Sequence, residues 1–197
     1  TVDPAGRFLY AHTEGADFNI NISQFQINQT TGALTFIRDL SLGEEDANNF
    51  VWSPGGAFLY QGAGTPKVKV FAKSSISGAL QQIQEVGCNC ANGPDGAGNV
   101  AIDGQGKFLF QATVSESGVA VYSRNSTTGL LTPLGSAFLS VSGSTPALAA
   151  DATGRFLEVV DDTGTTTFAV GADGTLTRAA GPTATPASGL VVLAVRF

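Results

Sequence analysis

The chain has 197 residues, of which 25 are glycine, none is methionine and only 13% are charged. This length suits one ordinary domain or an array of small repeats, and so few charges favour strands and turns over amphipathic helices. The formal net charge of −6 argues against nucleic acid or an anionic membrane as a partner, because both need clustered Lys and Arg. The longest apolar run, 189–195, has the length of a strand and is far short of the roughly 20 residues of a membrane-spanning helix.

Two motifs recur in register along the chain. The first, at 3–10, combines an Asp-Pro-x-Gly turn with Phe-Leu-Tyr and returns at 53–60, 103–110 and 151–158. Its shared glycine stands at Gly6, Gly56, Gly106 and Gly154, so the repeats are 50, 50 and 48 residues apart. The second is a Thr/Ser/Asp-Gly turn followed by leucine, at 31–34, 77–80, 128–131 and 173–176. Such a period indicates a repeat architecture.

Each repeat predicts four short strands. An apolar strand precedes the first turn, and the Phe-Leu-Tyr strand follows it. The third strand alternates apolar and polar residues and carries one aromatic residue per repeat, and the second turn leads to the fourth strand. The predicted fold is therefore all-β, a β-propeller with four four-stranded blades in one domain, 1–197. The expected blades are approximately 1–42, 43–87, 88–140 and 141–189, with a closing strand at 190–197.

The two ends of the chain suggest how the first blade is completed. The chain starts almost at the first turn, so the first blade lacks most of its innermost strand. We expect the strand at 190–197 to complete that blade and to remove an open edge. Three arrangements remain open: a ring of four blades, an eight-bladed ring of two chains, and part of a longer propeller.

The cysteines and the first residues bear on the compartment. Cys88 and Cys90 are separated by one residue, which is the spacing of neither a zinc knuckle nor a C-x-x-C redox motif. They form either a disulfide across a very short ring or two thiols without a partner role. The chain opens on Thr1-Val2-Asp3-Pro4 with no signal peptide, as a processed chain would, and we expect a secreted protein, extracellular or periplasmic.

The motif Asp3-Pro4-x-Gly6-Arg7-Phe8-Leu9-Tyr10, followed by an aromatic strand and Thr30-Thr31-Gly32-x-Leu34-Thr35, resembles the seven-bladed propeller lactonases. That family includes 6-phosphogluconolactonase-like enzymes and carboxymuconate cyclase relatives. The resemblance covers all four repeats. It implies blade architecture, and a lactone-hydrolysing activity as one possible function.

Acidic residues gather on one predicted face. In a propeller, the loops between strands two and three share a face with the loops between blades. The expected binding face carries Asp17, Glu44, Glu45, Asp46, Asp95, Glu116, Asp161 and Asp162. Carboxylate pairs there could hold calcium, although neither run has EF-hand spacing, and no other cofactor is predicted. Solvated acidic loops are the alternative interpretation.

His12 is the only histidine and therefore the first candidate for proton transfer. A lactonase could use His12 as general base, with Glu14 orienting it. An arginine would be needed to polarise the carbonyl, but Arg124 and Arg178 fall on predicted outer strands or turns. We therefore expect an extracellular scaffold for binding a partner or a second copy of the chain. A lactone hydrolase acting on a small lactone is the alternative.

Overall fold

The computed structural model describes residues 1–14, 19–43, 47–63, 67–88, 98–113, 118–138, 146–161 and 164–184. These residues form fifteen strands and no helix, which confirms the all-β prediction. The strands build four separate antiparallel sheets, and each sheet comes from one sequence repeat. Within the described segments, no helix exists that could cross a membrane.

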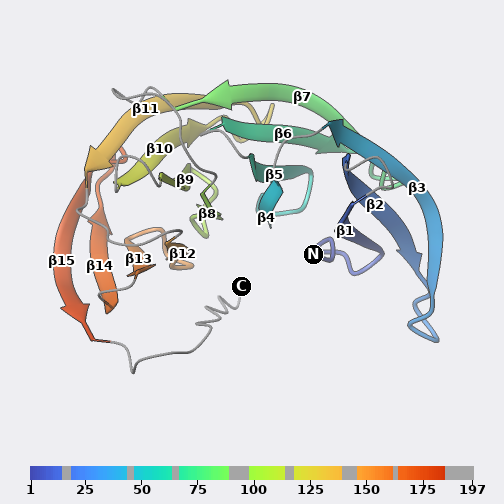
Figure 1. The fold of residues 1–197 in the computed structure, drawn as a ribbon, viewed down its shortest axis with the longest axis horizontal. Coiled ribbons are helices and arrows are strands. Elements are labelled where there is room, and N and C mark those ends of the chain that lie inside the picture. Colours follow the sequence, from blue (N-terminus) through green and yellow to red (C-terminus); the bar gives the residue numbers. More distant parts are fainter. Residues whose placement is uncertain are drawn as a thin grey trace.

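The four sheets are the blades of a propeller, and each runs in chain order from the centre of the molecule to its rim (Figure 1). Their strands are, in blade 1, β1 (Phe8–Glu14), β2 (Ile20–Ile27) and β3 (Leu34–Gly43); in blade 2, β4 (Ala47–Trp52), β5 (Phe58–Ala63), β6 (Lys67–Lys73) and β7 (Leu80–Gly87); in blade 3, β8 (Val100–Ile102), β9 (Phe108–Thr113), β10 (Gly118–Arg124) and β11 (Leu131–Phe138); in blade 4, β12 (Ala147–Ala150), β13 (Phe156–Asp161), β14 (Gly164–Val170) and β15 (Leu176–Thr183).

Blade 1 has three named strands where four were predicted. Residues before its first turn take part of the innermost position, because Val2 pairs with Leu9 in an antiparallel bridge. The Thr1 amino group donates to the Tyr10 carbonyl at 2.8 Å, and the Tyr10 amide donates to the Thr1 carbonyl at 2.8 Å. The predicted closing strand, 190–197, lies outside the described residues, so its pairing stays a prediction.

The repeated turn is held by its first residue. The Asp3 carboxylate accepts hydrogen bonds from the Arg7 and Phe8 amides at 2.7 and 2.9 Å, and Asp103 and Asp151 make the same pair of bonds in their blades. The glycine three residues later has a positive φ, 68° at Gly6, which a residue with a Cβ rarely adopts. The sequence motif therefore specifies where one strand ends and the next begins.

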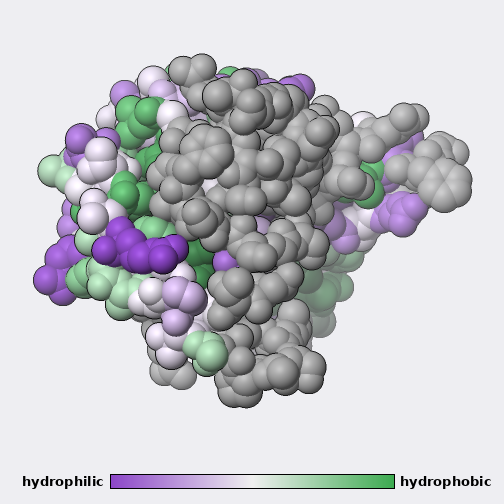
Figure 2. Space-filling view, turned by 60° about the vertical axis from the view of Figure 1, so that its left-hand side comes forward, coloured by the Kyte–Doolittle hydropathy of each residue, from purple (hydrophilic) through white to green (hydrophobic). Residues whose placement is uncertain are grey.

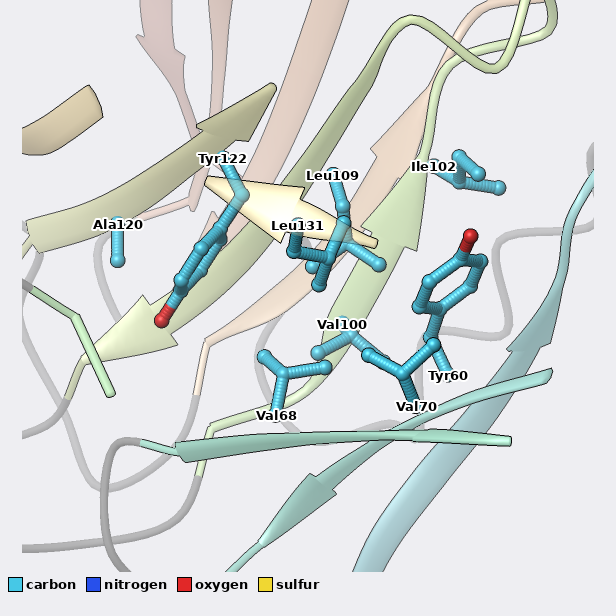
Figure 3. Packing of buried hydrophobic residues seen from close by; sticks show 9 residues of the cluster. All are labelled: Tyr60, Val68, Val70, Val100, Ile102, Leu109, Ala120, Tyr122 and Leu131. Carbon is cyan, nitrogen blue, oxygen red and sulfur yellow. The ribbon is translucent and has the colours of Figure 1, made fainter. Parts of the chain in front are cut away.

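The hydrophobic core consists of three layers, one between each pair of successive blades. Between blades 2 and 3, Tyr60 and Val70 pack against Leu109 and Tyr122, all fully or almost fully buried (Figure 3). The layers between blades 1 and 2 and between blades 3 and 4 are built from the corresponding positions. Blades 2 and 3 thus bury apolar residues on both sides, so neither could cover its own core without its neighbours.

The blades form an open arc with blade 1 and blade 4 at its two ends (Figure 1). The described blades therefore do not close a ring of four by themselves. The rim strands expose large apolar residues: Leu34, Phe36 and Ile37 on β3, Ile83 on β7 and Leu134 on β11. Hydrophilic and hydrophobic residues are interspersed on the face shown in Figure 2.

Candidate functional site

A hollow of about 580 Å³ lies on the concave side of the arc. Its walls are the inner strands β4, β8 and β12 together with the first residues of the chain, all of which face the centre in Figure 1. Most of the lining is apolar, and the polar exceptions are few. The lining residues are Thr1, Val2, Pro4, Asn49, Phe50, Val51, Trp52, Val100, Ala101, Ile102, Leu148, Ala149 and Ala150. This composition, a largely apolar concavity with a few polar groups, is typical of small-molecule sites.

Asn49 fixes the relative position of two of these walls. Its side-chain amide donates to the Val100 carbonyl at 2.8 Å and accepts from the Val100 amide at 2.7 Å, so it pairs with β8 as a backbone segment would. Asn99, 50 residues later, donates to the Pro146 carbonyl at 3.2 Å, just before β12. Two asparagines at the repeat spacing thus connect the inner ends of blades 2, 3 and 4. Neither asparagine was predicted as a site residue, although their spacing follows the repeat.

Trp52 places an unsatisfied donor in the wall of the hollow. Its Nε1 is buried and has no hydrogen-bond partner. The indole ring packs edge-on against Tyr10, with 5.2 Å between ring centroids. The Lys73 ammonium lies 5.3 Å from the centroid of the indole ring. An unpaired buried N–H is costly, which makes Trp52 a candidate donor to a bound acceptor.

His12 stands beside the hollow and does not line it. It lies on the side of β1 that faces blade 2, where its ring centroid is 3.9 Å from that of Phe50, a lining residue. Its Nε2 is buried without a partner. Burial, and then the positive charge of the chain's amino group, lower the pKa of His12 to about 4. The imidazole is therefore neutral at neutral pH and can accept a proton, although a pKa this low makes it a weak base.

The structure does not bring the other predicted catalytic groups to His12. Glu14 is exposed at the end of β1, and no hydrogen bond joins it to the His12 ring among the described residues. Arg124 acts as an inter-blade clamp, since its Nε donates to the Tyr60 hydroxyl at 2.6 Å and its Nη1 to the Gly106 carbonyl at 2.8 Å. Arg178 lies over the Phe168 ring on blade 4. No described arginine lines the hollow.

The predicted acidic face lies mostly outside the described residues. This applies to Asp17, Glu44, Glu45, Asp46, Asp95, Glu116 and Asp162. Asp161 is described, and its Oδ1 accepts from the Gly164 amide at 3.2 Å. The described residues contain no cluster of three metal-ligating side chains, and calcium binding by the acidic loops stays a prediction. Cys88 is disulfide-bonded, whereas Cys90, its predicted partner, is outside the described residues.

Blades built from one repeat and arranged around a central hollow define a β-propeller protein. The family model for the lactonase 7-bladed β-propeller matches residues 1–86 and 64–193 of the chain. The chain therefore belongs to the seven-bladed β-propeller lactonase family, as its turn motifs predict. No curated protein matches the chain.

Solved structures share the fold. A provisionally assigned 6-phosphogluconolactonase from Bacteroides fragilis NCTC 9343 is 24% identical, with a TM-score of 0.74 over 91% of this chain and 52% of its own. A provisionally assigned 6-phosphogluconolactonase from Bacteroides uniformis ATCC 8492 is 20% identical, with a TM-score of 0.79 and the same coverage. The periplasmic gluconolactonase of Pseudomonas aeruginosa is 23% identical, with a TM-score of 0.73 over 90% of this chain and 51% of its own. The chain thus spans about half the length of these proteins.

Proposed function

We propose that the chain contributes to hydrolysis of a small lactone and that the hollow beside β4, β8 and β12 takes the substrate. The observation that carries this proposal is a ligand-sized hollow at the inner strands of a chain from the lactonase family. The family membership and the gluconolactonase neighbours support the hydrolytic alternative better than the scaffold that the sequence alone favoured. Extracellular or periplasmic location stays a prediction.

The proposed reaction adds water to the lactone carbonyl and breaks the ring C–O bond, giving a hydroxy acid. The neutral imidazole of His12 is the described group that can take the proton from water. The ring of Phe50 lines the hollow and contacts His12, which does not line it. A substrate in the hollow therefore reaches His12 only if the Phe50 side chain moves. The Trp52 N–H, which is buried in the wall of the hollow without a partner, is our proposed donor to the lactone oxygen and reaches it only if the indole moves.

The test is a pH-stat assay of the purified chain with glucono-δ-lactone and other aldonolactones, with the uncatalysed rate subtracted. We expect turnover that falls at least about tenfold in His12→Gln, which retains a polar side chain but cannot serve as base. Ile76→Ser is the matched control, because Ile76 is 88% exposed on an outer turn and should leave turnover unchanged. A rate no higher than that of buffer for every lactone would exclude the hydrolytic function, and full activity of His12→Gln would remove His12 from it.

A further inference from the structure

Three Asn-x-Ser/Thr triplets, the acceptor motif for N-linked glycans, begin at Asn21, Asn28 and Asn125. A glycan is large and hydrophilic, so a folded chain can carry one only where the asparagine projects into solvent. Cys88 is disulfide-bonded, which is typical of chains that mature in an oxidising compartment, where this modification also takes place. The structure separates the three triplets into two classes.

Asn28 and Asn125 occupy the same position in blades 1 and 3. Each directly follows a strand, β2 or β10, and opens the turn that leads to the rim strand (Figure 1). Both asparagines are exposed. The Oδ1 of each accepts from the backbone amides two and three residues later, those of Thr30 and Thr31 at 2.9 and 3.0 Å, and those of Thr127 and Thr128 at 3.0 and 2.9 Å. These bonds hold the oxygen of each side chain against the turn. Within the described residues, neither Nδ2 donates a hydrogen bond, so the nitrogen that would carry a glycan is free.

The hydroxyl that completes each of these two triplets is also free. Thr30 and Thr127 are exposed, and neither hydroxyl takes part in a hydrogen bond with another described residue. The motif requires both the asparagine and this hydroxyl residue, so the transferase must reach the two together. At both turns they are accessible from solvent at the same time.

Asn21 differs from them in each of these respects. It lies inside β2, between Thr13 of β1 and Ser41 of β3, and is half-buried. The hydroxyl of its triplet belongs to Ser23, which is 5% exposed. That hydroxyl donates to the Asp39 carboxylate at 2.5 Å. A glycan at Asn21 would lie against the face of the sheet, whereas one at a turn projects away from it.

We propose that Asn28 and Asn125 are acceptors of N-linked glycans and that Asn21 is not. In the transfer, the asparagine Nδ2 attacks the anomeric carbon of a lipid-diphosphate-linked oligosaccharide. A carbon–nitrogen bond forms, the bond from that carbon to the diphosphate oxygen breaks, the lipid diphosphate leaves, and the amide gives up one proton to the transferase. The amides that make the corresponding turn bond in blades 2 and 4 belong to Ser74 and Gly171, which have no amide side chain. The modification is therefore confined to blades 1 and 3 among the described turns.

Both glycans would project from the face of the propeller that carries the repeated turns. Gln29, next to Asn28, donates from Nε2 to the Gly6 carbonyl at 2.8 Å, so the acceptor turn lies beside the first Asp-Pro-x-Gly turn. Strand β1 begins at that turn and ends with Glu14 at the opposite face, and His12 lies nearer to that end. Glycans at the turns therefore leave His12 accessible, and the proposal does not depend on lactone hydrolysis.

The test is secretion of the full chain from a eukaryotic host behind a cleavable leader. Intact mass is measured before and after peptide-N-glycosidase treatment in heavy-oxygen water, which converts each occupied asparagine to a labelled aspartate that peptide mapping locates. We expect two glycans, at Asn28 and Asn125. Thr30→Ala should remove the glycan at Asn28, because it deletes the hydroxyl of the motif and leaves the backbone amides that hold the asparagine in place. Thr30→Ser keeps the hydroxyl and is the matched control.

Thr127→Ala and Thr127→Ser form the corresponding pair for Asn125, and circular dichroism checks that each variant remains folded. Asn21→Gln should leave both glycans in place. A secreted, folded chain without a glycan at Asn28 or Asn125, from cells that fully modify a reference glycoprotein, would overturn the proposal for that residue. A glycan on Asn21 in the folded chain would overturn the distinction between turn and strand positions.

Persistence of the Asn28 glycan in Thr30→Ala would show that the triplet does not direct the modification.

Discussion

The Lys73 ammonium of blade 2 lies 2.6 Å from the Asp3 carboxylate of blade 1, and both side chains are almost completely buried. Asp3 is also the residue that holds the first turn through the Arg7 and Phe8 amides. Burial by itself raises the pKa of Asp3, but the bonds from Lys73 and from the two amides outweigh it and hold that pKa below its ordinary value. One carboxylate thus joins a local turn to the contact between two blades.

Lys73→Met should lower the free energy of unfolding by about 3–5 kcal/mol, because it leaves the Asp3 charge buried without its cation. Urea denaturation measures the effect. Asp3→Asn combined with Lys73→Met should cost less than the single change at Lys73, since no charge is then left unpaired. Lys67→Met is the control: Lys67 and Glu85 form an ion pair of similar length, 2.7 Å, but with side chains 39% and 34% exposed, and its loss should cost less than about 1 kcal/mol. Equal effects at Lys67 and Lys73 would contradict this assignment.

Tyr60→Phe should destabilise the chain more than Tyr10→Phe. The Tyr60 hydroxyl both donates to the Gly129 carbonyl and accepts from Arg124 Nε, so its removal leaves two partners in blade 3 unsatisfied. The Tyr10 hydroxyl has one such partner, the Gly78 carbonyl. The expected losses are about 2 kcal/mol for Tyr60 and about 1 kcal/mol for Tyr10, measured by chemical denaturation. The reverse order would show that Arg124 finds another acceptor.

Gly104→Ala should cost about 1–3 kcal/mol through steric overlap alone. A Cβ at Gly104 would overlap the backbone of Ala152 in the neighbouring turn, including its carbonyl oxygen, and Gly104 has no positive φ that would add strain. Because the clash is with backbone, Ala152→Gly should not rescue the variant. A thermal melt of the single and double variants tests this, and a wild-type melting temperature for Gly104→Ala would show that the two turns can move apart.

His12 should make stability depend on pH between about 4 and 6.5. Its pKa is lowered from 6.5 to about 4 in the folded chain, so within this window the unfolded chain binds a proton that the folded chain does not. The stability from this difference is fully present above pH 6.5 and is lost as the pH falls toward 4. The expected loss is about 1–2 kcal/mol, since the half-exposed ring is partly screened by solvent.

The measurement is the difference in unfolding free energy between wild type and His12→Gln across this pH range. Carboxylates such as Asp3 titrate in both chains and cancel in the difference. A difference that does not change with pH would show that His12 is as accessible to protons in the folded chain as in the unfolded one.

The candidate site was much harder to predict than the fold. The inner strands that line the hollow carry mostly apolar residues, such as Val100 and Leu148, which in sequence look like ordinary core. His12 stood out because it is the only histidine, but its burial depends on Phe50, which comes from another repeat. The acidic residues of the predicted binding face lie largely outside the described residues, so that prediction is still open.

The four repeats, their turns and the alternation of each strand can be recognised in the amino-acid sequence alone. Those features depend on residues within a few positions of one another, as in Asp3 with its Arg7 and Phe8 amides, and can therefore be recognised in the chain. Which of these faces are covered follows only from how the blades pack in space. Leu9 with Phe25 follows the same pattern as Leu59 with Phe71, but the second pair packs against blade 1 and is completely buried, whereas the first is only half-buried. Burial depends on which segments meet in space, and a local pattern does not contain that information.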